Sequence, residues 1–139
     1  MGLFDRLIEN TKKTDEKYIL FAKAGLVLSK IDNDFSEEEN DWIVEYFRSK
    51  PEITNERLEK ILTKGSENLE ELTSLSKLET LDDKKEFINF LINVAEADGK
   101  IDEAEFKFLM EISIKLDLVN EYKNVLKNLA LKMLLKGIG

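Results

Sequence analysis

Hydrophobic residues recur along this 139-residue chain at the three- and four-residue spacing of amphipathic helices. No stretch shows the alternation of apolar and polar residues that is typical of β-strands. The single proline, Pro51, and six scattered glycines interrupt the helical pattern at few places. The pattern therefore predicts an all-α fold, a compact bundle of about seven to eight helices with short connections.

The expected helices are recognised by their apolar faces. In chain order these apolar faces lie within Leu3–Ile8, Tyr18–Ile31, Trp42–Phe47, Leu58–Leu62, Leu69–Leu75, Phe87–Ala95, Phe108–Leu116 and Tyr122–Met133, and the helices extend beyond them. Thr54 is the expected N-cap of the fourth helix, and Asp83 with Glu86 forms the expected capping box of the sixth. The length fits a single domain, residues 1–139, with amphipathic terminal helices over residues 1–13 and 120–139.

Composition excludes several classes of site. The chain has neither histidine nor cysteine, which leaves oxygen atoms as the donors for a metal and rules out a Ser-His-Asp or Cys-His catalytic group within the chain. Its 21 basic and 29 acidic residues give a net charge of −8, which argues against nucleic-acid binding. The N-terminal apolar residues are interrupted by charges, unlike a signal peptide, so a cytoplasmic location is expected.

The chain also contains an internal repeat. A shift of 66 residues aligns IDNDFSEEENDWIVEYF, which begins at Ile31, with the segment that begins at Ala97. An apolar helix precedes each copy and another follows it, so the pattern predicts two pseudo-symmetric helical hairpins. The shift places Asp32 on Asp98, Asn33 on Gly99, Phe35 on Ile101, Glu37 on Glu103 and Glu39 on Glu105.

The stretch VAEADGKIDEAEF, residues 94–106, ends like a calcium-binding EF-hand loop. An EF-hand needs oxygen ligands at three alternating positions up to its glycine, and a glutamate six residues after the glycine. Asp98, Gly99 and Glu105 match the closing half, but the two earlier positions hold Val94 and Glu96. A valine cannot bind calcium, and the first copy departs from the loop in the same way. Neither copy is therefore a complete EF-hand.

Helix caps explain part of this motif. Gly99 is expected to end a helix in the left-handed conformation, and Asp102 with Glu105 forms an expected capping box of the next helix. Caps do not explain Asp32 and Asp98, because the dipole at a helix C-terminus disfavours negative charge. Carboxylates gathered in this way need a compensating cation or abundant water.

The segments AEADGKIDEAE and KIDNDFSEEE, each after an apolar helix, resemble the TerB-like family over residues 18–118. That family includes tellurite-resistance TerB proteins and the N-terminal part of DjlA-type co-chaperones. The resemblance implies a compact, pseudo-symmetric helical fold, a link to stress responses, no enzymatic activity and an acidic metal-binding site. The first copy departs from the family pattern by carrying Asn33 in place of glycine. Carried over to this chain, the implied metal ligands are Asp32, Glu39, Asp98 and Glu105.

Two functions follow as hypotheses. In the first, two acidic corners, Asp32 with Glu39 and Asp98 with Glu105, form one pocket that binds a divalent cation such as calcium or magnesium. The expected Kd is about 10⁻⁴ to 10⁻³ M because few protein ligands are present. In the second, the corners only cap helices, and the domain recruits a protein partner as a co-chaperone accessory module does. Carboxylate pairs can perform acid–base chemistry, but no nucleophile or cofactor loop accompanies them, so an enzyme is not expected.

The C-terminal stretch YKNVLKNLALKMLLKGIG is basic and amphipathic. Such a helix can lie on an anionic membrane surface or bind a partner. Packing of its apolar stripe on the core, with the lysines in water, is the preferred interpretation.

Overall fold

The computed structural model describes residues 2–31, 37–67, 69, 75–97, 99 and 101–138. Within this part of the chain there are no strands, so the all-α prediction is confirmed. The described elements are α1 (Leu3–Lys30), α2 (Glu37–Arg48), α3 (Asn55–Gly65), the short 3₁₀ helix η1 (Leu75–Lys77), α4 (Leu81–Glu96), α5 (Glu103–Lys115) and α6 (Lys123–Ile138).

The described residues contain six α-helices, fewer than the seven to eight predicted. The two helices expected at Leu3–Ile8 and from Tyr18 are one continuous helix, α1. The polar segment between them contains neither glycine nor proline, and nothing in it stops the backbone hydrogen bonds from continuing. Of the helix expected at Leu69–Leu75, residues 70–74 lie outside the described residues, and η1 begins at its last position.

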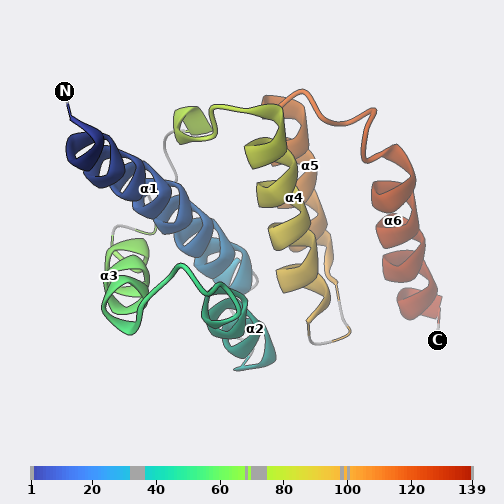
Figure 1. The fold of residues 1–139 in the computed structure, drawn as a ribbon. Helices are drawn as coiled ribbons and strands as arrows, with labels where there is room; N and C mark the ends of the chain where they lie inside the picture. The colour runs from blue at the N-terminus through green and yellow to red at the C-terminus, as the bar shows by residue number, and fades with distance from the viewer. Residues whose placement is uncertain are drawn as a thin grey trace.

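Helices α1 and α4 form the centre of the molecule (Figure 1). Helix α3 packs on α1, α2 packs on both central helices, and α5 packs on α4. Helix α6 packs on α5 and stands at the edge of the molecule, on the side of α4 and α5 that faces away from α1 (Figure 1). No helix in the described part of the chain combines the length and apolarity needed to cross a bilayer.

The core is rich in aromatic rings. Phe90 lies at its centre, with its ring centroid 5.2 Å from Phe21, 4.9 Å from Tyr46 and 5.6 Å from Trp42. Rings at these separations and in tilted or edge-on orientations attract each other in addition to burying apolar area. The apolar faces of α1, α4 and α5 meet in this core, where Phe21, Phe87, Leu91, Leu109 and Ile112 are buried and Leu26 is partly buried.

The helix bounds reproduce the repeat. Helices α1 and α4 end at Lys30 and Glu96, and α2 and α5 begin at Glu37 and Glu103, so the residues of each pair are 66 positions apart. The hydrogen-bonded residues Lys17 and Asp83 have the same separation. The C-terminal half of α1 with α2 and α3 therefore corresponds to α4, α5 and α6. Each repeat thus has three helices, one more than the predicted hairpin.

Residues at equivalent positions also meet in space. The rings of Phe21 and Phe87 are 5.2 Å apart, and Lys17 Nζ lies 3.1 Å from Asp83 Oδ1. In a two-fold arrangement, only residues near the axis contact their own counterparts. The pseudo-two-fold axis therefore passes between α1 and α4, through the centre of the core.

Helix α3 lies close against α1 because its last residue is glycine. A Cβ atom at Gly65 would lie 2.7 Å from Cβ of Ala22, a distance that real Cβ atoms do not reach. The buried Asp15 carboxylate accepts hydrogen bonds of 2.9 and 2.7 Å from Nε and Nη2 of Arg57, which fixes α3 along α1. The side chain of Thr54 caps α3 as predicted.

The terminal segments behave differently from each other. The α6 region docks on the core through Tyr122, Leu126 and Leu129, and the side chains of Lys123, Lys127 and Lys132 are exposed, as predicted. The first two turns of α1 instead expose an apolar stripe made of Leu3, Phe4, Leu7 and Ile8.

Candidate functional site

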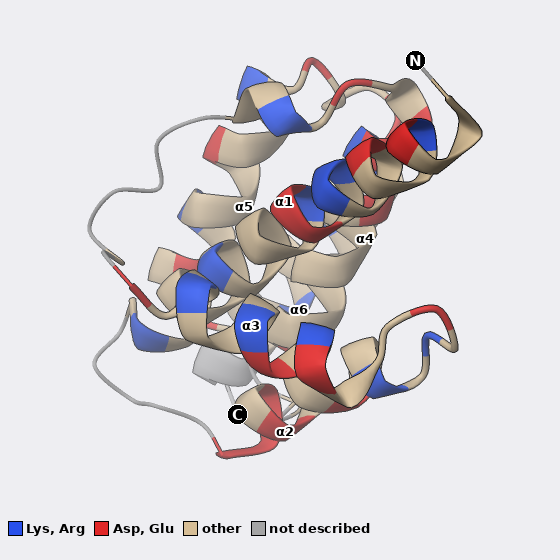
Figure 2. Ribbon diagram, turned by 60° about the vertical axis from the view of Figure 1, so that its left-hand side comes forward, with Lys and Arg blue, Asp and Glu red and all other residues tan. Residues whose placement is uncertain are grey.

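Two glutamates from the two repeats meet inside the protein. Glu39 lies in the first turn of α2 and Glu105 in the first turn of α5, at equivalent positions. Their carboxyl groups are close enough for Glu39 to raise the pKa of Glu105, and the two residues are only 3% and 4% exposed. This pair is the part of the predicted acidic pocket that the structure brings together. Figure 2 shows the acidic first turn of α2 in red.

Local helix capping accounts for the position of Glu105. The carboxylate of Asp102 accepts a 2.8 Å hydrogen bond from the backbone N–H of Glu105, and Oε1 of Glu105 accepts a 3.4 Å bond from the N–H of Asp102. This is the predicted capping box. Gly99, which precedes it, has a φ of 76°, in the left-handed region as predicted. The cap uses Oε1 and leaves Oε2 buried, with no hydrogen-bond donor for it among the described residues.

Electrostatics disfavours two negative charges at this point. Burial, the contact with the carboxyl group of Glu39, and the charges of Glu39 and Asp102 together raise the pKa of Glu105 to about 9. The positive ends of the α2 and α5 dipoles favour one negative charge here, but two adjacent buried carboxylates repel each other strongly. Two ionised carboxylates are therefore disfavoured here at neutral pH, and a shared proton or a cation would relieve their repulsion.

The other two predicted ligands, Asp32 and Asp98, lie outside the described residues. Among the residues that are described, no group of three or more acidic side chains is placed to hold a metal ion. The described contribution to a cation site is therefore the Glu39–Glu105 pair. The prediction that four carboxylates converge stays a prediction.

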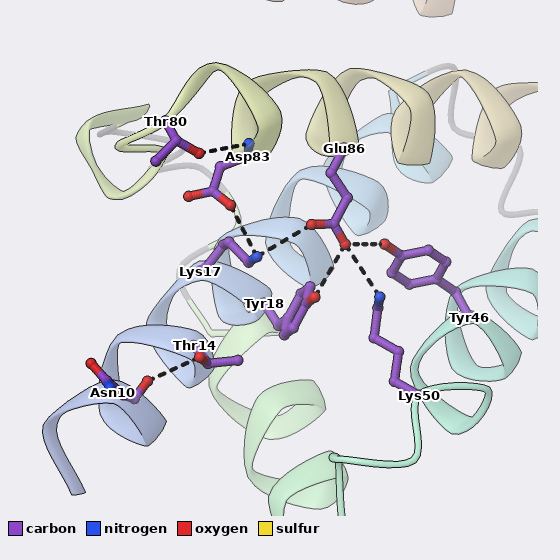
Figure 3. A network of polar contacts seen from close by, with 9 residues as sticks. All are labelled: Asn10, Thr14, Lys17, Tyr18, Tyr46, Lys50, Thr80, Asp83 and Glu86. Carbon is purple, nitrogen blue, oxygen red and sulfur yellow. Dashed lines mark hydrogen bonds and ion pairs between the residues drawn. The ribbon is translucent and has the colours of Figure 1, made fainter. Parts of the chain in front are cut away.

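A second polar cluster joins α1, α2 and α4 (Figure 3). Oε2 of Glu86 accepts hydrogen bonds from the hydroxyl groups of Tyr46, at 2.6 Å, and Tyr18, at 3.1 Å, and lies 3.3 Å from Nζ of Lys50. Nζ of Lys17 bridges Oε1 of Glu86, at 3.2 Å, and Oδ1 of Asp83, at 3.1 Å. We refer to these six residues as the Glu86 cluster.

The Glu86 cluster is electrically balanced, with two lysines against two carboxylates. Burial alone would raise the pKa of Glu86, but the hydrogen bond from Tyr46 and the charges of Lys17 and Lys50 hold it below its ordinary value. Burial, followed by the hydrogen bond to Glu86, raises the pKa of the Tyr46 phenol. Tyr46 is thus a neutral donor and Glu86 an ionised acceptor, as a structural junction requires.

The sequence did not reveal this cluster. Asp83 and Glu86 were expected to cap α4, but α4 begins at Leu81, and the hydroxyl of Thr80 accepts the hydrogen bond from the N–H of Asp83. That expectation was wrong because α4 starts earlier than its apolar face. One available signal was the repeat, since Lys17 and Asp83 occupy equivalent positions.

A polar cavity of about 390 Å³ lies beside this cluster, between α1, η1 and the start of α4. Its charged walls are largely neutralised by ion pairs, such as the 3.1 Å contact between Lys77 Nζ and Glu16 Oε2. Nothing in its lining supplies a nucleophile poised beside a general base. Its residues are Lys13, Thr14, Glu16, Lys17, Lys77, Glu79 and Asp83.

Comparison with known proteins gives one family. The family model described as "Tellurite resistance protein TerB" matches residues 21–124, which is most of the chain and includes both acidic corners. No curated protein and no solved structure matches the chain.

Proposed function

Since the chain belongs to the TerB family, we propose that it is a non-enzymatic, cytoplasmic stress-response module whose buried glutamate pair helps to bind a divalent cation. The observation that supports this function is the meeting of Glu39 and Glu105 across the two repeats, away from solvent. A role in tellurite resistance is proposed from the family alone.

The donor atoms of the pair fit a hard cation. Calcium and magnesium prefer carboxylate oxygens, and a cation between Glu39 and Glu105 would replace the shared proton and remove the repulsion between the charges. Asp32 and Asp98 are the proposed additional ligands. Because the chain offers so few ligands, we expect a Kd of about 10⁻⁴ to 10⁻³ M, as in the weakest calcium modules.

The alternative is a protein-interaction or co-chaperone accessory module in which the acidic corners serve only as helix caps. The observation that favours it is the Asp102–Glu105 capping box, which is complete without any metal. Under this alternative, a proton on the glutamate pair is sufficient, and no cation changes the stability of the fold.

A calcium or magnesium titration at pH 8 separates the two functions. A cation at ten times its Kd stabilises a fold by about 1.4 kcal/mol, so the melting temperature should rise by several degrees. Trp42, one helical turn from Glu39, supplies a fluorescence signal in the same titration. Because the cation displaces a proton, the apparent affinity should also increase between pH 6 and pH 8.

The matched variants are Glu105→Gln and Glu103→Gln, which lie in the same turn of α5. Glu105 is buried, whereas the side chain of Glu103 is 73% exposed. Glu105→Gln should abolish the cation-induced rise and Glu103→Gln should keep it. A wild-type protein that no cation stabilises, at concentrations up to about 10 mM, would support the capping alternative instead.

A further inference from the structure

Helix α6 has two apolar faces, and the core covers only one of them. The inner face includes Leu126 and Leu129, both buried, and Tyr122 just before the helix donates a 3.1 Å hydrogen bond to the backbone oxygen of Lys85. The outer face, made of Leu131, Leu134 and Leu135, is 47%, 60% and 66% exposed. Residues at this spacing lie together on one side of a helix.

The repeat gives a reason why Leu131 stays outside. Leu131 is the counterpart of Gly65, the residue that lets α3 approach α1, and Ile88 is the counterpart of Ala22. At these equivalent positions the second repeat has two bulky residues, whereas the first repeat has a glycine packed against an alanine. Helix α6 therefore cannot lie against α4 as closely as α3 lies against α1.

The charge of α6 has the opposite sign to that of the rest of the protein. The helix carries four lysines and no acidic residue, so its charge is +4. Since the net charge of the whole chain is −8, the rest of the chain carries −12. Lys127 is one turn before Leu131 on the outer face and is exposed, and Lys132 makes only a 3.6 Å contact with Glu96 at the surface. The outer face is thus basic towards its start and apolar towards its end.

We propose that the outer face of α6, formed by Lys127, Leu131, Leu134 and Leu135, docks on an anionic phospholipid surface. Lysines beside exposed leucines complement negatively charged headgroups and the acyl boundary beneath them. A second copy is a poorer occupant, because α6 carries no acidic residue, so pairing the outer faces of two α6 helices would place Lys127 of each copy against another basic helix.

The acidic body of the protein does not prevent this docking. Helices α4 and α5 stand between α6 and the helices α1, α2 and α3 (Figure 1). A helix with its side chains is about 10 Å across, more than the Debye length of about 8 Å at physiological salt. Repulsion between the lipid surface and the acidic residues beyond α4 and α5 is therefore screened.

The test is flotation of the full chain with vesicles of phosphatidylcholine alone and with vesicles containing equal parts of phosphatidylcholine and phosphatidylglycerol. We expect the protein to bind only the anionic vesicles, and less strongly as salt is added. The double variant Leu134→Gln/Leu135→Gln should bind at least about tenfold more weakly. Its melting temperature should not fall, because both side chains point away from the core.

The matched control is Leu3→Gln/Leu7→Gln, which alters the other exposed apolar stripe. Charge reversal at Lys127 should weaken binding roughly 20- to 30-fold, as expected for a lysine near an anionic surface, whereas Lys12→Glu, also at an exposed position, should change it little. The proposal is overturned if the wild-type chain stays unbound, or if only the N-terminal variants lose binding. It is also overturned if light scattering shows a dimer that Leu134→Gln/Leu135→Gln dissociates.

Discussion

At the scale of single residues, the least expected feature is a carboxyl group that sits in a helix cap and yet is shielded from water. Glu105 completes the capping box with Asp102, and its pKa is raised by the neighbouring carboxyl group of Glu39. A cap at the protein surface would use an ionised carboxylate. Here the pseudo-two-fold arrangement brings Glu105 next to Glu39 in the first turn of α2, so a residue of a local cap is also part of a buried carboxyl pair.

The raised pKa of Glu105 predicts how stability depends on pH. Folding raises this pKa from 4.5 to about 9, so between these values the folded protein holds a proton that the unfolded chain has lost. The free energy of unfolding should therefore decrease as the pH rises through this window, by up to about 1.4 kcal/mol per pH unit. Denaturant unfolding at several pH values, in the presence of a chelator, measures this slope.

The variant Glu105→Gln keeps the cap and removes the titrating group. It should unfold with a smaller decrease between pH 5 and pH 8, and it should be more stable than the wild-type protein at pH 8. Glu103→Gln, two residues before Glu105 and at an exposed position, should leave the slope unchanged. Equal slopes for the wild-type protein and Glu105→Gln would show that the pair holds no proton.

At the scale of helices, the sequence predicted local features better than the partners of each helix. The Thr54 cap, the left-handed Gly99 and the Asp102–Glu105 box follow from interactions within a few residues, and all three were predicted correctly. The continuity of α1 was missed because its polar middle segment lacks an apolar face, although the residues there favour helix. Apolar periodicity measures which side is buried and not where a helix ends.

The Glu86 cluster was missed for a related reason. Its donors come from α1, from α2 and from Lys50 just after α2, so no local pattern around Glu86 indicates them. For the candidate site, the repeat predicted one acidic pocket shared by the two copies, and Glu39 and Glu105 are its members among the described residues. Only the three-dimensional arrangement shows that they are buried.

The Glu86 cluster should hold α1, α2 and α4 together. Replacing the carboxylate by an amide in Glu86→Gln leaves Lys17 and Lys50 partly buried without their negative partner. We expect the free energy of unfolding to fall by about 1–3 kcal/mol, less than for a fully buried pair because these side chains retain some solvent contact. Urea denaturation monitored by circular dichroism measures the loss.

A surface ion pair gives the comparison for this variant. Glu45 contacts Arg48 at 3.1 Å, with both side chains more than half exposed. Glu45→Gln should therefore change the stability by less than about 0.5 kcal/mol. If Glu86→Gln were equally neutral, the cluster would contribute nothing beyond an exposed ion pair.

At the scale of the whole molecule, the two repeats share one core and differ at their edges. The axis residues hold the repeats together, while the third helices have diverged: α3 is seated on α1 through Gly65, and α6 stands off α4 with Leu131 facing out. The central pair of helices thus provides the fold. The proposed functions lie outside this central pair, at the acidic corners and on the outer face of α6.

A shared core predicts energetic coupling between the repeats. Phe21 and Phe87 are equivalent residues in contact, with ring centroids 5.2 Å apart in an edge-on arrangement. In a double-mutant cycle of Phe21→Leu and Phe87→Leu, we expect a coupling energy of about 0.5–1.5 kcal/mol. Phe21→Leu combined with Leu129→Ala, on α6 beyond α4 and α5, should be additive within about 0.5 kcal/mol (Figure 1).

Calorimetry should show one cooperative transition for each variant, because neither repeat can bury its axis residues alone. Additive losses at Phe21 and Phe87, or two separate transitions, would mean that each repeat is stable without the other.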